Sequence, residues 1–178
     1  MRGSGIARLG AVMAAAALAA GAAAAQPAVT TQATLLDRIQ IEDLLIAYYQ
    51  PLGGSHEEFT SFYTPGGVLD INGRVYKGKA GIVQAYKDAA GARGPGFKGK
   101  FHMLMTNPRI VVHGDTATAD AVWTGISSPT VRAQPQFVEQ GHEHDELVKQ
   151  NGRWLIARRL VTSDGGLPDY YQKTYRDR

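Results

Sequence analysis

The sequence predicts an α+β fold in which helices cover one face of a curved antiparallel sheet. Segments with helical periodicity lie in the first half of the chain, and four long segments with strand character fill the second half. Short turn sequences, rather than helices, separate these strands, which favours hairpins over parallel crossovers.

The first element is a helix in TLLDRIQIEDLLIAYYQP, residues 34–51. Thr34 and Asp37 resemble a capping box with Asp in place of Glu, and Pro51 ends the helix. The apolar residues follow the i, i+3, i+4 and i+7 spacing of one helical face: Ile41, Leu44, Leu45 and Tyr48.

Three shorter elements follow the first helix. The segment SHEEFTSFYTPGG predicts a second short helix that ends before Pro65. VLDINGRVYKG predicts a β-hairpin that turns at Asn72-Gly73, and KAGIVQAYKDAA predicts a third helix followed by a glycine-rich loop.

The remaining chain predicts four strands: KFHMLMTNPRIVVHG, DTATADAVWTGIS, QFVEQGHEHDELVKQ and RWLIARRLVTS. The last two are joined by the turn dipeptide Asn151-Gly152. Side chains alternate along a strand, so the charged segment EQGHEHDELVK divides between two faces, and alternation alone leaves open which one is inward. One face carries His142, His144 and Glu146, and the other carries Glu139, Gly141, Glu143 and Asp145.

The N-terminus has the features of a secretory signal peptide. Arg2 and Arg8 precede an Ala-rich run, and Ala23-Ala24-Ala25 fits a cleavage site before Gln26. A retained membrane anchor is less favoured, because the run is short and mostly Ala. We therefore expect a periplasmic or secreted protein. The expected layout is a signal peptide at 1–25, a linker at 26–33, one domain at 34–165 and a tail at 166–178.

Composition excludes some function classes. The mature chain of 178 − 25 = 153 residues is long enough for one domain with a real core, and it contains no Cys, so packing alone must hold it. Without the two arginines of the signal peptide, 19 − 2 = 17 basic residues face 16 acidic ones. This balance is not that of a nucleic-acid binder, and we expect no membrane association after cleavage.

The order of elements, with the segments IEDLLIAYY, GRVYKGKAGI, HMLMTNPRIVVHGDTATADAVW and DELVKQNGRWLIARRLV, resembles the SnoaL-like family of the NTF2-like superfamily over residues 35–165. The resemblance implies a conical barrel with a deep pocket. It also implies a small, largely apolar ligand, no cofactor, and a homo-oligomer, either a dimer or a trimer. The superfamily includes dehydratases, isomerases, polyketide cyclases, a dehydrochlorinase and members with no known activity, so fold does not fix function.

Related lyases, such as scytalone dehydratase, bile-acid 7α-dehydratase and lindane dehydrochlorinase, remove a proton from carbon with a histidine that an aspartate orients. The aspartate falls five residues after Tyr48, where this chain has Gly53, so the dyad is broken. His102 is the candidate base. Strict alternation gives its pocket position to Met103 unless a β-bulge turns His102 inward, and a methionine-lined apolar pocket is the alternative.

The resemblance turns Glu143 inward, where it could replace the missing aspartate. A buried Glu143 needs a partner such as His102, Tyr48 or Arg159, although the strand could instead leave it at the open rim. Arg159 matches a pocket arginine that would steady negative charge; as an alternative, it is a solvated strand residue. The expected catalytic set is therefore His102, Glu143, Tyr48 and Arg159, and the expected substrate-binding set is Tyr49, Met103, Met105, Trp123 and Asp145.

Two functions stay open at this point. One is a cofactor-independent lyase (dehydratase) or isomerase that uses a histidine base, and the other is a non-catalytic binding or assembly module of the same fold. The enzyme requires His102 within hydrogen-bond reach of a carboxylate or tyrosine inside the pocket. We expect no metal, because the His142/His144 pair lacks evident further ligands. These histidines are expected to be solvated or to contact another subunit.

Overall fold

The computed structural model describes residues 29–50, 52, 55–92 and 99–165 of the chain. The expected signal peptide, the C-terminal tail and most of the glycine-rich loop lie outside the described residues. Within the described part, no helix combines the length and apolarity needed to cross a membrane.

The structure confirms the α+β class. In chain order the elements are α1 (Leu35–Tyr48), the 3₁₀ helix η1 (Glu58–Phe62), β1 (Tyr63–Ile71), β2 (Arg74–Lys77), α2 (Gly78–Ala92), β3 (Lys100–His113), β4 (Thr116–Ser128), β5 (Gln136–Gln150) and β6 (Arg153–Gly165). One six-stranded sheet has the order β2-β1-β6-β5-β4-β3. All neighbours are antiparallel except β1 and β6, which pair in parallel, so the predicted meander β3 to β6 is extended by a small hairpin.

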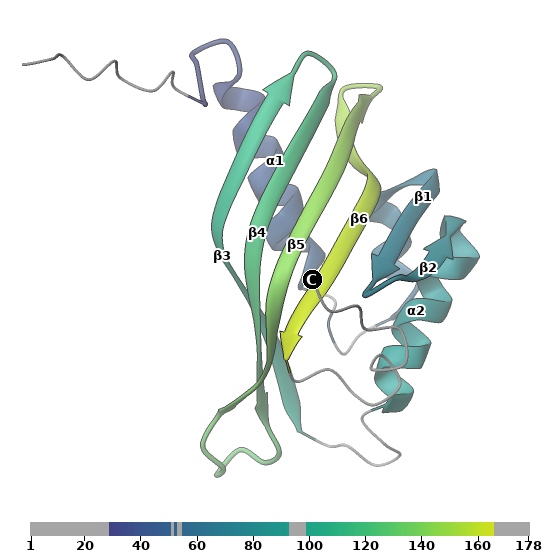
Figure 1. Cartoon of the computed structure of the whole chain (residues 1–178), viewed down its shortest axis with the longest axis vertical. Helices are drawn as coiled ribbons and strands as arrows, with labels where there is room; N and C mark the ends of the chain where they lie inside the picture. Colours follow the sequence, from purple (N-terminus) through teal and green to yellow (C-terminus); the bar gives the residue numbers. More distant parts are fainter. Residues whose placement is uncertain (1–28, 51, 53–54, 93–98, 166–178) are drawn as a thin grey trace, which may run out of the picture.

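The long strands curve around the helices. In Figure 1, α1 crosses behind β3, β4 and β5, whereas α2 lies beside the β1–β2 hairpin. The space between helices and sheet holds a core of buried apolar side chains, among them Ile41, Leu45, Leu69, Ile82, Leu147 and Ile156. Within the described part of the chain, the helices therefore cover the concave face, and the residues on the other face of the long strands are mostly half-buried or exposed.

Both predicted Asn-Gly hairpins are present. Asn72 and Gly73 have φ of 50° and 86°, and Asn151 and Gly152 have φ of 51° and 77°. Positive φ at both central residues is the signature of a type I′ turn, which Asn-Gly adopts at little cost. The β5–β6 turn sets the register as far as Leu147 and Ile156, and a bulge beyond this pair shifts the register by one residue, so that Asp145 pairs with Arg159.

The predicted capping box of α1 is wrong. Thr34 makes no side-chain cap bond, and its Oγ1 instead accepts from the backbone N of Thr31 at 3.0 Å. Asp37 accepts hydrogen bonds from Lys149 Nζ at 2.6 Å and Trp154 Nε1 at 2.9 Å. A cationic and an aromatic donor on the sheet outcompete a local cap, so Asp37 ties α1 to the β5–β6 hairpin.

The second predicted helix is shorter than expected. It is one 3₁₀ turn that ends at Phe62, and β1 begins at Tyr63, ahead of Pro65. Proline lacks the N–H that a strand ladder needs, but the β1–β6 register shifts between Tyr63 and Val68, so Pro65 lies in an irregular stretch.

Candidate functional site

A cavity of about 190 Å³ lies between the helices and the concave face of the sheet. Its walls are rich in aromatic side chains, and Phe59 stacks on Tyr86 with ring centroids 3.7 Å apart. The volume is below the roughly 300–1,000 Å³ typical of sites for drug-sized ligands, so the cavity suits a smaller molecule. The aromatic lining consists of Tyr48, Tyr49, Phe59, Tyr86, Phe101 and Trp123.

A buried ion pair supports one wall. Arg159 on β6 donates from Nε to Asp145 Oδ1 at 2.7 Å and from Nη2 to Asp145 Oδ2 at 2.9 Å. Both side chains are 1% exposed. Asp145 lies on β5 and accepts both of these hydrogen bonds. Arg159 lines the cavity, whereas Asp145 does not.

Glu143 is a second carboxyl beside the same arginine. Its Oε2 accepts a hydrogen bond from the Tyr49 hydroxyl, and its Oε1 lies 3.0 Å from Arg159 Nη2. Burial raises the pKa of Glu143 to about 8; Arg159 opposes that rise, and the charge of Asp145 adds to it. A cavity-lining carboxyl is therefore largely protonated at neutral pH.

Two polar atoms of this cluster have no hydrogen-bond partner. They are Arg159 Nη1 and Glu143 Oε1, since the 3.0 Å contact of Oε1 with Arg159 does not have hydrogen-bond geometry. Buried polar atoms are costly when unpaired, and both belong to residues that line the cavity. A ligand oxygen could therefore satisfy them.

The ring of Tyr48 packs against the guanidinium group of Arg159. The guanidinium carbon lies 3.7 Å from the centroid of the Tyr48 ring, and the Tyr48 hydroxyl is hydrogen-bonded to those of Tyr63 and Tyr86. Burial raises the pKa of Tyr48, so it stays a neutral phenol. This tyrosine orients the arginine and closes the inner wall.

The cavity brings together most of the residues expected from sequence. Two of the nine lie near it without lining it. Met105 packs against the core, and Asp145 is buried at Arg159. Their expected contact with substrate stays a prediction. The expected residues that do line it are Tyr48, Tyr49, Met103, Trp123, Glu143 and Arg159.

His102 is not in the cavity. It is exposed on the outer side of β3, whereas its neighbours Phe101 and Met103 line the cavity. A bulge does occur, between Thr106 and Arg109, but it lies beyond His102 and leaves regular alternation around it. The expectation that His102 faces the pocket as a base is therefore wrong, and methionine takes the inward position.

The structure adds cavity residues that the sequence did not nominate. Of the five histidines, His56 lines the cavity, from the segment between α1 and η1. Phe59, Tyr86 and Phe101 were missed as well. An irregular segment has no periodicity from which to infer the direction of a side chain, so His56 left no usable signal.

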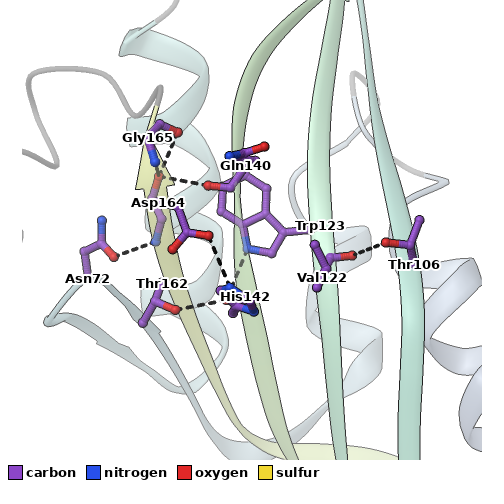
Figure 2. A network of polar contacts seen from close by, with 10 residues as sticks. Asn72, Thr106, Val122, Trp123, Gln140, His142, Thr162, Asp164 and Gly165 are labelled. Atoms are coloured by element: carbon purple, nitrogen blue, oxygen red, sulfur yellow. Dashed lines mark hydrogen bonds and ion pairs between the residues drawn. The ribbon is translucent and has the colours of Figure 1, made fainter. Parts of the chain in front are cut away.

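The outer face of β5 carries two histidine–carboxylate pairs of the segment EQGHEHDELVK. His144 Nδ1 lies 2.7 Å from Asp120 Oδ1, and His142 Nε2 lies 3.2 Å from Asp164 Oδ2, as Figure 2 shows for the second pair. Trp123 donates from Nε1 to the backbone oxygen of His142 at 3.2 Å. Nowhere in the described ranges do three or more His, Cys, Asp or Glu residues come together as metal ligands would.

The curved sheet with its helices has the NTF2-like, cystatin-like fold, an architecture shared with solved structures. The model of the SnoaL-like domain matches residues 33–160, and the chain belongs to the SnoaL-like family. No curated protein matches the sequence significantly.

Several solved structures share the fold at low identity. A protein of unknown function from Mycobacterium tuberculosis is 22% identical, with TM-score 0.64, over 74% of each chain. A protein from Catenulispora acidiphila, solved in complex with S-DNPA, is 23% identical, with TM-score 0.63, over 75% of this chain and 96% of that one. An NTF2-like protein from Novosphingobium aromaticivorans is 19% identical, with TM-score 0.61, over 82% and 92%.

Proposed function

We propose that the protein is a cofactor-independent lyase or isomerase that binds a small, largely apolar molecule and transfers protons through Glu143. One feature carries this proposal: Glu143 is a buried carboxyl that lines an apolar cavity, and its burial raises its pKa to about 8. A group that titrates near the working pH is the most effective acid–base catalyst, and burial is the usual way to bring a carboxyl there.

The surroundings of Glu143 suit a reversible proton donor. Tyr49 donates to one carboxyl oxygen, and Arg159 lies beside the other. Both contacts stabilise the carboxylate that remains once the proton has left. The protonated form of Glu143 also forms a side-chain hydrogen bond with Asp145, which favours retention of the proton until a base draws it away.

His56 takes the role of base in this proposal, because it is the histidine that lines the cavity. In a dehydration, His56 removes a proton from carbon, the electron pair of that C–H bond forms the double bond, and the neighbouring C–O bond breaks. Glu143 gives its proton to the departing hydroxyl, which leaves as water. The imidazolium then returns its proton to the carboxylate, directly or through water, so atoms and charge balance.

Proton exchange at carbon tests the chemistry without knowledge of the substrate. We expect the protein to accelerate deuterium incorporation next to the carbonyl of 2-tetralone in D₂O, followed by NMR. Glu143→Gln and His56→Gln should each slow the exchange by at least ~10²-fold. His102→Gln is the matched control, since His102 is exposed on the outer side of the sheet, and it should leave the rate unchanged. Full activity of Glu143→Gln would contradict the proposal.

A non-catalytic binding module is the second candidate. Gly53 at the position of the family aspartate, together with the exposed His102, favours it, because the usual His–Asp dyad is absent from this chain. Binding of small apolar molecules without any proton exchange would decide for this candidate. Mass spectrometry of small molecules that co-purify with the mature protein would identify the ligand in either case. The solved neighbour in complex with S-DNPA supports small-molecule binding on this fold.

We also propose export and self-association on the basis of the sequence. The features of residues 1–25 support cleavage before Gln26 and a periplasmic or secreted location. Intact-mass analysis should give a mature N-terminus at Gln26, and intact Met1 on the exported protein would contradict it. Light scattering should give the mass of a dimer or trimer, and a monomer would contradict self-association.

A further inference from the structure

An arginine in an apolar cavity usually favours a carboxylate ligand, but the charge of Arg159 is already matched. Asp145 takes two of its hydrogen bonds in a fork at 2.7 and 2.9 Å. Paired in this way, the two groups carry no net charge, and burial raises the pKa of the third group, Glu143, to about 8, so this carboxyl is mostly protonated at neutral pH. The cluster of Arg159, Asp145 and Glu143 therefore offers a ligand hydrogen-bond donors but carries no net positive charge.

We propose that the cavity selects an uncharged molecule with an acceptor oxygen over its carboxylate counterpart, and that Asp145 determines this selectivity by occupying Arg159. The inference rests on the proposed binding function and names the class of molecule that the same site takes. A ketone, aldehyde or similar neutral oxygen acceptor on a flat apolar body fits this description.

The remaining geometry of Arg159 supports the exclusion of an anion. A carboxylate gains most from arginine when it accepts two parallel hydrogen bonds. Asp145 holds Nε and Nη2, and the ring of Tyr48 lies 3.7 Å from the guanidinium carbon. Nη1 is the nitrogen left without a partner, and it can serve one acceptor oxygen but not a carboxylate fork.

The other charged groups at the cavity lead to the same selectivity. An anionic ligand would lie beside the carboxyl of Glu143 and would share the cavity with Glu139. Two carboxyls at close range cannot both ionise without a large cost, so an anion must take up a proton or displace one. His56 also lines the cavity, and its imidazole can accept or donate to a neutral ligand.

Two probes of nearly equal shape test the selectivity: 2-acetylnaphthalene, which is neutral, and 2-naphthoate, which is anionic. By calorimetry near neutral pH, the wild-type protein should bind the ketone at least ~10-fold more tightly. In Asp145→Asn the charge of Arg159 becomes available, so naphthoate should gain at least ~10-fold while the ketone stays within about 3-fold. Asp120→Asn removes the same charge from the outer face, where Asp120 pairs with His144, and should change neither affinity.

Equal or tighter binding of naphthoate by the wild type would overturn the selectivity. An unchanged preference in folded Asp145→Asn would overturn the role of Asp145. Binding of neither probe would contradict the proposed function instead, and NMR titration of a ¹³C-labelled Glu143 carboxyl, assigned with Glu143→Gln, then decides the charge state without any ligand. This titration also decides the question if Asp145→Asn does not fold. The carboxyl should remain protonated at pH 6, and an ionised Glu143 there would overturn the inference.

Discussion

Strand β5 points Glu143 and Asp145 into the molecule and His142 and His144 out of it, and each side finds charged partners on neighbouring strands. Inside, Asp145 lies 2.7 Å from Arg159 with both side chains 1% exposed. Outside, His144 also lies 2.7 Å from its partner Asp120, but these side chains are 42% and 50% exposed. Equal distances thus occur in very different surroundings.

Burial determines how strongly an ion pair affects the stability of the protein and the titration of its members. Water screens the outer pairs, so their attraction is small and easily replaced by hydration. The inner groups have lost that hydration, so each depends on the others to remain charged or to remain neutral. We therefore expect substitutions on the inner face to change stability and titration, and matched substitutions on the outer face to change little.

The largest effect should come from Arg159→Ala. This change leaves Asp145 and Glu143 buried without a cation, and breaking a buried pair in this way costs about 3–5 kcal/mol of unfolding free energy. Urea denaturation of the variant and the wild type measures the difference.

Its matched control is Arg158→Ala on the neighbouring outward position. Arg158 lies 3.7 Å from Asp70 and 3.9 Å from Glu146, with its side chain 48% exposed. The loss should stay below ~1 kcal/mol. Similar losses for the two arginines would mean that burial does not distinguish the faces.

The pH dependence of stability should follow Glu143. Its pKa is raised from 4.5 to about 8 in the folded protein, so the folded state holds a proton that the unfolded state releases. The resulting stabilisation is fully present below about pH 4.5 and is lost as pH rises to 8, by an amount on the order of a few kcal/mol. The free energy of unfolding should therefore fall with pH across this window.

Glu143→Gln should flatten that dependence, because the amide does not titrate. Glu146→Gln, three residues away on the solvent face of β5, should retain the wild-type slope. Urea denaturation at several pH values measures both slopes. An unchanged slope in Glu143→Gln would show that Glu143 is ionised in the folded protein.

Gly141→Ala should be the next most harmful change. A Cβ there would lie 2.0 Å from the backbone oxygen of Thr162 and 2.7 Å from Cζ2 of Trp123, so the strands or the cavity wall must shift. Overpacking of this kind costs about 1–3 kcal/mol. Gly66→Ala is the control, since a Cβ there meets nothing within 4 Å. Thermal unfolding should separate the two, and equal melting temperatures would contradict the close packing under Trp123.

The sequence allowed the fold to be predicted because its signals are local. Asn72-Gly73 and Asn151-Gly152 specify their turns by themselves, and a turn fixes the register of the strands on either side. The parallel pairing of β1 with β6 had no such signal, since it joins segments about ninety residues apart.

The candidate site was predictable in part for the same reason. Alternation along β5 kept Glu143 and Asp145 on one face, and the family resemblance turned that face inward. Neither argument could show that Arg159 donates two hydrogen bonds to Asp145, because this contact depends on side-chain packing across strands. His56 was missed because it lies in an irregular segment, and His102 was misjudged because the family resemblance was given more weight than the alternation, which is regular around it. The period fails further along the strand. On β3 a bulge at Asn107, with φ of 53°, places Met105 and Ile110 on the same face although five residues separate them.

The smallest effects are expected on the outer face. His144→Gln removes an exposed pair and should change the free energy of unfolding by less than ~0.5 kcal/mol. A His-x-His arrangement on one strand invites the question of a metal, yet Asp120 occupies one nitrogen of His144, and His142 faces Asp164. Addition of Zn²⁺ or of a chelator should therefore leave the melting temperature unchanged in both the wild type and the variant. A rise with Zn²⁺ that disappears in His144→Gln would identify a metal site on this face and would give the outer histidines a role that screened ion pairs do not have.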